Sequence, residues 1–235
     1  MLKWFKEFLL ALKGGSKTTP SVTPPPQPQP PVKTPLARDL FLYDINNMLN
    51  DWYVSQVGVK ESGWNKGKEV ELYQKTVDGV SEQEAWCMAF MQTGLLEVAK
   101  KLQVYPDLKH MSAVDIYKAI PIHKSESCMS VFTKTNKKYV REFTNLDSLL
   151  GFEHQCWFIQ QQFADPNKGH TGKVFETMDV EFSTVEGNTN GAGSSEGDGV
   201  YKKMRPFGNT KDKKLRGFVN VTAAIYDMIQ GNSKV

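Results

Sequence analysis

Three cysteines and four histidines are the side chains with which this 235-residue chain could perform nucleophilic chemistry. A thiol attacks only as the thiolate, so a catalytic cysteine needs a helix N-terminus or a histidine nearby to lower its pKa. Cys87 lies in SEQEAWCMAF, at or near the start of an expected helix, whereas Cys128 lies in a polar stretch and Cys156 in an expected strand. Cys87 is the best candidate nucleophile, although a single cysteine is usually just a small buried apolar residue.

His170 is the best candidate for the base that would serve Cys87. The segment GHTGKVFE places it directly after a loop and at the mouth of an expected strand. The other three histidines, His110, His123 and His154, lack that setting. The ordinary alternative is a solvated loop histidine.

A hairpin would bring two polar side chains to His170. If KVFETMDVEFSTVEG turns about Asp179, the numbers of opposite residues sum to 358, so His170 faces Asn188 and lies diagonal to Glu186. A carboxylate or amide there would fix the imidazole tautomer and stabilise the imidazolium. A slip of one residue would turn both side chains to the other face of the strand. Glu186 is expected to be accessible, so Glu186→Gln should slow catalysis with little change in stability.

The elements that must position these residues follow an α+β order, with helices first and an antiparallel sheet after them. Helical spacing predicts helices over 40–54 and 81–102, the second with Ser81 and Glu84 as a capping box. With that cap, Cys87 lies more than one turn inside the helix, and a start nearer Ala85 would bring the helix dipole closer to it. The expected strands are CWFIQQQF, KVFETMDVEFSTVEG and GVYKKMRPF.

The chain divides into three segments. Residues 1–13 form an expected basic amphipathic helix, which could contact a membrane surface or a protein partner, or pack on its own domain. Residues 14–36 are a proline-rich linker, expected to be extended and semi-rigid, with an SH3-type ligand as the alternative. Residues 37–232 mix polar and apolar residues as a folded domain does.

Composition excludes several classes of protein. With 29 basic and 26 acidic residues the net charge is only +3, too weak to indicate nucleic acid as partner. No apolar run is long enough for a spanning helix or a secretory signal, so synthesis in a reducing cytoplasm with free thiols is expected. The Gly187–Gly199 loop lacks the strand and helix of a phosphate-binding motif.

A metal site remains the first alternative, because His154 and Cys156 are close in sequence and Cys128 or His123 could join them. Their spacings match no paired zinc pattern, so no metal and no cofactor are expected. A monomer is expected.

Four blocks together resemble the CHAP-domain proteins common among phage lysins. They are GVKESGWNKGKEV (58–70), AWCMAF (85–90), GHTGKV (169–174) and TVEGNTNGAGSSEGDGVYKKMRPF (184–207), and they follow the order found in the family. The resemblance spans most of the chain after Val57. Many relatives have a proline-glycine-aspartate turn before the histidine strand, which this chain lacks, and residues 104–150 match nothing recognisable in the family.

The resemblance implies a papain-like α+β fold, with N-terminal helices packed on an antiparallel sheet, and a peptidoglycan amidase or endopeptidase. Cys87 would be the nucleophile, His170 the base and Glu186 the group that orients His170, while Asn188 would share that role or polarise the site. A phage lysin of this kind is made in the bacterial cytoplasm and acts on the cell wall. Two alternatives stay open: a non-catalytic wall-binding module, and a virion-borne hydrolase tethered through residues 1–13.

Overall fold

The structure, a computed structural model, describes residues 37–149, 156–191 and 197–231. Residues 35–235 form one compact unit. The expected N-terminal helix (1–13) and proline-rich linker (14–36) lie outside the described residues, as does His154. No helix in the part of the chain that the structure describes is both long and apolar enough to cross a membrane.

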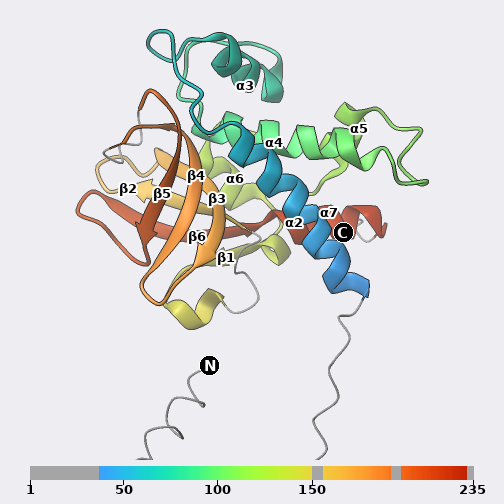
Figure 1. The fold of residues 1–235 in the computed structure, drawn as a ribbon. Helices are drawn as coiled ribbons and strands as arrows, with labels where there is room; N and C mark the ends of the chain where they lie inside the picture. Colours follow the sequence, from blue (N-terminus) through green and yellow to red (C-terminus); the bar gives the residue numbers. More distant parts are fainter. Residues whose placement is uncertain (1–36, 150–155, 192–196, 232–235) are drawn as a thin grey trace, which may run out of the picture. The chain divides into compact units, whose positions relative to one another are not determined.

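The described part is a mixture of helices and one antiparallel sheet, which confirms the α+β class (Figure 1). Helices come first, but one further helix closes the domain after the last strand. Their bounds are α2 Ala37–Ser55, α3 Lys68–Asp78, α4 Cys87–Leu102, α5 Ala113–Ala119, α6 Cys128–Lys134 and α7 Val221–Ile229. The sequence analysis predicted the first of these correctly and missed α3, α5, α6 and α7.

The predicted capping box at Ser81 is wrong, because α4 begins at Cys87. The preceding segment is held out of the helix by side chains from elsewhere in the fold. Gln74 donates from Nε2 to the carbonyl of Glu84 at 2.8 Å, and Asn65 donates from Nδ2 to the carbonyl of Gln83 at 2.9 Å. These tertiary hydrogen bonds override a local sequence preference that is worth only about 1 kcal/mol.

Six strands form the sheet, in the order β1-β6-β2-β3-β4-β5. Figure 1 shows the strands on one side of the domain and α2, α4, α5 and α7 on the other. The bounds are β1 Val140–Glu142, β2 Cys156–Gln162, β3 Gly169–Thr177, β4 Glu181–Thr189, β5 Gly199–Pro206 and β6 Lys213–Asn220. The three predicted strand segments are thereby confirmed, and β1 and β6 were not predicted.

The β3–β4 hairpin has the predicted register at the end that carries His170 and Glu186. Lys173 pairs with Val185 and Val174 with Thr184, so both pairs sum to 358. Nearer the turn the register shifts by one residue, and Glu176 pairs with Ser183. This irregularity lies between the site and the turn, so it does not alter the pairing next to Glu186, whereas a second irregularity in β4, between Glu186 and Thr189, falls at Asn188.

Strand β2 is buried on both faces, because helices cover one side and a second aromatic cluster fills the other. Trp157 and Ile159 belong to the large core shared with the helices, whereas Phe158 packs with Phe182 and Phe218. The alternation follows from the two-residue period of a strand. The β2 strand next to His170 is thus covered by apolar side chains on both faces.

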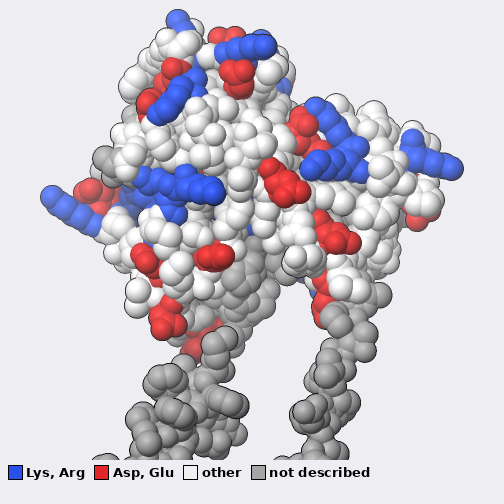
Figure 2. Space-filling view, in the orientation of Figure 1, with Lys and Arg blue, Asp and Glu red and all other residues white. Residues whose placement is uncertain are grey.

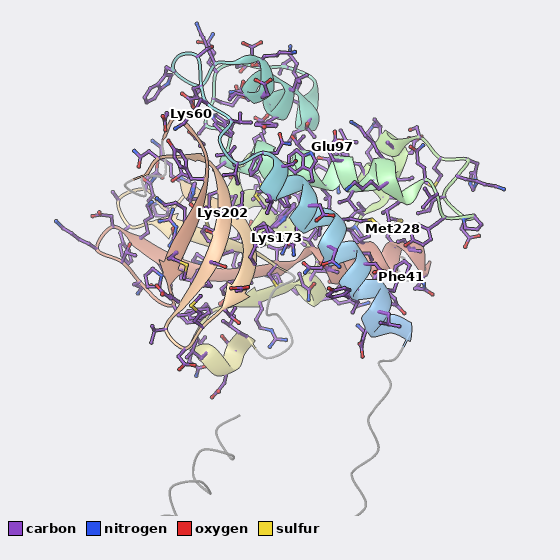
Figure 3. All side chains as sticks on the ribbon, in the orientation of Figure 1. Phe41, Lys60, Glu97, Lys173, Lys202 and Met228 are labelled. Carbon is purple, nitrogen blue, oxygen red and sulfur yellow. The ribbon has the colours of Figure 1, made fainter. Side chains whose placement is uncertain are left out.

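Helices α2 and α7 pack on each other through apolar side chains beside this core. Phe41 on α2 lies against Tyr226 of α7, with ring centroids 5.7 Å apart. Figure 3 labels Phe41 on α2 and Met228 on α7, two helices that contact each other. Helix α7 therefore supports α2, which in turn packs on α4.

Candidate active site

Cys87 is the first residue of α4, where the backbone N–H groups have no partner within the helix. The backbone N–H of Phe90 donates to the carbonyl of Trp86 at 2.9 Å, so the earlier N–H groups of the turn have no partner within the helix. These groups and the helix dipole favour negative charge at this end. A start at Cys87 therefore gives the thiol more electrostatic help than the predicted start at Ser81.

Trp86 fixes the entry into the helix. It is fully buried, and its indole Nε1 donates to Glu61 Oε1 at 2.7 Å. The ring of Tyr73 lies against it, with centroids 5.6 Å apart. Because Trp86 is anchored on two sides, the backbone that carries Cys87 is held in place.

His170 is the second residue of β3 and is fully buried. Its Nε2 lies 2.8 Å from Glu186 Oε2, which confirms the predicted proximity of these two side chains. Its Nδ1 has no hydrogen-bond partner among the described residues. Cys87 and His170 are close enough for each to shift the pKa of the other, and Nδ1 is the nitrogen available to the thiol because Glu186 occupies Nε2. Such contacts are often loose until substrate binds.

Glu186 lies at the centre of a buried hydrogen-bond network, not on an accessible surface as predicted. Its Oε1 accepts from Thr184 Oγ1 at 2.6 Å and from Arg205 Nε at 2.8 Å. Oε2 is shared between His170 and the Arg205 guanidinium. Burial alone would raise the pKa of Glu186, but hydrogen bonds and charge from Arg205 and His170 prevail and lower it to about 2.

Arg205 was missed by the sequence analysis. It lies on β5, four residues beyond Tyr201, the cross-strand partner of Glu186. Only its long side chain lets it reach back to the carboxylate. The one signal in the sequence was an arginine near the end of a strand, which is a weak indication of a buried ion pair.

Gly172 gives Glu186 the room it needs. A Cβ atom built on Gly172 would lie 2.5 Å from Glu186 Cγ and 2.8 Å from the carbonyl oxygen of Val185. No side chain fits at that distance without a shift of the strand. Gly172, the second glycine of the GHTGKV block, therefore leaves room for the Glu186 carboxylate to lie across β3 toward His170.

Asn188 lies beside the start of α4 and does not hydrogen-bond His170. With its amide oriented to satisfy both neighbours, the oxygen accepts from the Trp86 N–H at 3.3 Å and the nitrogen donates to the Gly197 carbonyl at 3.1 Å. Its φ of 54° is in the left-handed region, which asparagine tolerates better than most residues. Asn188 thus positions the residue before Cys87, so the predicted direct role on His170 is not what the geometry indicates.

The electrostatics of the site favour a thiolate and an imidazolium. The pKa of Cys87 is held well below its ordinary value, first by a hydrogen bond from Cys128 and then by His170 and the backbone of Met88, against the opposing effect of burial. Burial lowers the pKa of His170, but hydrogen bonds to Cys87 and Glu186 outweigh it and the net pKa is raised. The site is therefore arranged to hold an ion pair near neutral pH.

This arrangement predicts that Cys87 reacts with iodoacetamide at a pH well below the ordinary thiol range. Because its pKa is lowered, the rate should stay high as the pH falls through 8 and 7, whereas in His170→Ala, which keeps only the contributions of Cys128 and the backbone, the rate should begin to fall at a higher pH. The measurement is the alkylation rate of Cys87 by peptide mass analysis. Cys156, which is fully buried in β2, is the internal control and should stay unmodified. Equal pH profiles in the two proteins would contradict the ion pair.

A pocket of about 270 Å³ lies beside the nucleophile. It is smaller than sites for drug-sized ligands (~300–1,000 Å³), so it suits the part of a substrate next to a scissile bond. Its lining includes Ala85, Cys87, Glu126, Cys128, Gln162 and Lys168. A larger hollow of about 390 Å³ lies over β3, β4 and β5 and includes none of the candidate catalytic residues.

Of the remaining candidates, Cys128 lies against Cys87, whereas His123 and Cys156 do not converge on it. His123 uses its backbone N–H to bind Thr135, and Cys156 is buried within β2. Within residues 37–149, 156–191 and 197–231, no three His, Cys, Asp or Glu side chains lie close enough to hold a metal ion.

Comparisons of the chain with protein-family models, with curated proteins and with solved structures found no match. The geometry and the resemblance of the four blocks therefore carry the functional argument.

Proposed function

We propose that this protein is a cysteine-dependent hydrolase that cleaves an amide bond of peptidoglycan, either a muramoyl-alanine bond or a peptide bond. The observation that carries the reaction type is the buried pair of His170 and Glu186, with Nε2 and Oε2 2.8 Å apart, together with a Cys87 whose pKa His170 helps to lower. The substrate class is supported by the resemblance of the four sequence blocks to CHAP-domain lysins.

In the first half of the reaction, the Cys87 thiolate attacks the amide carbonyl carbon and forms a tetrahedral intermediate. The imidazolium of His170 gives its proton to the leaving nitrogen, the C–N bond breaks, and a thioester with Cys87 remains. The N–H groups in the first turn of α4, which have no partner within the helix, are suitable donors to the oxyanion. Glu186 stabilises the positive charge on His170 before that proton is given up.

In the second half, neutral His170 takes a proton from water, and the resulting hydroxide attacks the thioester. The acid product leaves and the Cys87 thiolate is restored beside imidazolium. Glu186 stays ionised throughout, since Arg205 keeps its pKa low. Its role is to orient His170 and not to accept the proton.

The finer fold assignment is part of this proposal. A papain-like CHAP domain is supported by a nucleophile at the first residue of a helix, a histidine on the adjacent sheet and a preceding set of helices. The visible face in Figure 2 intersperses basic and acidic side chains. Such a mixed surface fits a wall polymer with both charges better than a nucleic acid.

Two other assignments remain as alternatives. A wall-binding module without catalysis would have no need of a buried carboxylate on the histidine or of an arginine that keeps it ionised. A virion-borne hydrolase tethered by residues 1–13 keeps the same chemistry, and its tether lies outside the described residues. In either catalytic case, the protein would be made in the cytoplasm of an infected bacterium and act on its wall.

Mass spectrometry of purified peptidoglycan digested with the protein tests the proposal. We expect new free amino and carboxyl ends at one kind of amide bond, and their identity names the bond. The Cys87→Ala protein is the matched control and should release no new ends. Fragments with new reducing sugar ends, or no fragments from walls of several compositions, would overturn the assignment.

A further inference from the structure

A second thiol lies against the proposed nucleophile. Cys87 Sγ and Cys128 Sγ are 3.6 Å apart, although the two residues are 41 positions apart in sequence. Both are free and buried, with 5% and 4% of their surface exposed. Each is the first residue of a helix, Cys87 of α4 and Cys128 of α6. In the proposed mechanism Cys128 takes no part in bond making or breaking, and its hydrogen bond only helps to keep Cys87 ionised.

The distance between the sulfur atoms is close to what a disulfide requires. An S–S bond is about 2.0 Å long, so the two atoms have to approach by roughly 1.6 Å. The two thiols also differ in reactivity. Hydrogen bonding between them lowers the pKa of Cys87 and raises that of Cys128, so Cys87 is the thiolate and Cys128 keeps its proton.

Small oxidants have a route to both sulfurs. Cys87 and Cys128 line the same pocket of about 270 Å³, and the exposed residues Ser127, Asn167 and Lys168 also contribute to its lining. A molecule the size of hydrogen peroxide fits such an opening easily. A nearby thiolate, a protonated thiol partner and solvent access are together the features of a redox-sensitive cysteine.

We infer that Cys87 and Cys128 form a site of reversible oxidation, in which peroxide converts the two thiols into an intramolecular disulfide. The Cys87 thiolate attacks one peroxide oxygen, which gives a sulfenic acid and releases hydroxide. Cys128 then attacks the sulfenic sulfur and displaces its hydroxyl, and the proton of Cys128 leaves with it as water. Two electrons pass from the two sulfurs to peroxide, and an external dithiol returns them on reduction.

The disulfide has a protective consequence. A sulfenic acid that meets no second thiol is oxidised further to sulfinic acid, which ordinary reductants do not reverse. Cys128 intercepts that intermediate. The consequence for hydrolysis rests on the proposed function, because only a catalytic Cys87 links its oxidation to activity, whereas formation of the disulfide does not depend on it.

The test treats the reduced full-length protein with a small molar excess of hydrogen peroxide. We expect the intact mass to fall by two hydrogens, the free thiol count to fall from three to one, and peptide mapping to join Cys87 to Cys128. Dithiothreitol should restore the original mass. Cys156→Ala is the matched control and should form the same disulfide. Oxidation of Cys87 to sulfinic acid while Cys128 stays reduced would overturn the inference.

A second variant, Cys128→Ser, distinguishes protection of Cys87 by the neighbouring thiol from a purely structural role of Cys128. In Cys128→Ser, peroxide should add two oxygens to Cys87, and activity should not return with dithiothreitol. In the wild type, hydrolysis should fall at least about tenfold and then recover. If Cys128→Ser does not fold, the mass measurements on the wild type still decide the inference. If the disulfide forms but hydrolysis was never present, the proposed function fails and the oxidation site stands.

Discussion

Replacing Cys87 with alanine should abolish hydrolysis of wall amides while leaving the domain folded. Without the thiolate no acyl-enzyme can form, so we expect the rate to fall by at least roughly a thousandfold. The loss in stability should be small, about 1 kcal/mol, because the change removes one sulfur atom from a residue beside a pocket. Turbidity of a cell-wall suspension measures the first effect and thermal unfolding the second.

Cys156→Ala is a suitable control for this variant. Cys156 is another buried cysteine, but it lies in β2 and contacts a different apolar cluster, that of Phe158 and Phe182. It should lose some stability and keep its activity. Wall lysis by Cys87→Ala at the wild-type rate would show that this thiol is not the nucleophile.

Glu186→Gln should lower both the hydrolysis rate and the stability. Glutamine leaves the Arg205 guanidinium without its counter-charge in a buried network, and breaking a buried pair costs about 3–5 kcal/mol. The imidazolium of His170 also loses its stabilising charge, so the rate should fall roughly a hundredfold or more. Thermal or urea unfolding and initial lysis rates measure the two effects. This expectation replaces the one from sequence, which treated Glu186 as accessible.

The pH dependence of stability checks the reason for that loss. The pKa of Glu186 is lowered from 4.5 to about 2, so its ionisation stabilises the fold fully above about pH 4.5 and progressively less as the pH falls toward 2. The difference in the free energy of unfolding between wild type and Glu186→Gln should therefore become smaller as the pH falls from 4.5 toward about 2. Glu176→Gln, at an exposed position on β3, is the control and should differ little from wild type. A difference that stays constant with pH would contradict an ionised Glu186.

The part of the candidate site that lies within one hairpin could be predicted from sequence. The positions of His170 and Glu186 depend only on where the chain turns and on the two-residue period of strands. The bulge between Val174 and Glu176 could have broken this reasoning, but it falls on the side of the turn. Local pairing therefore placed His170 beside Glu186.

The other half of the site could not be predicted, because it depends on contacts between distant segments. The start of α4 is set by Gln74 and Asn65, which belong to α3 and the loop before it. Cys128 comes to the site through α6, an element with no clear signal in a polar stretch. Arg205 reaches Glu186 from β5. This strand was predicted from the sequence, but its pairing register with β4 was not. Pattern reasoning has no access to such tertiary contacts.

The buried network around Glu186 has a consequence for how substrates are drawn to the site. In the ion-pair state, Cys87 and Glu186 each carry a negative charge, while His170 and Arg205 each carry a positive charge, so the four charges cancel. Their combined long-range field is that of a compact multipole, which decays faster with distance than that of a net charge. Diffusing wall fragments of either sign should meet little attraction or repulsion from these four residues, and added salt has little of their field to screen. Capture and choice of substrate then rest on residues around the pocket, such as Glu126 and Lys168.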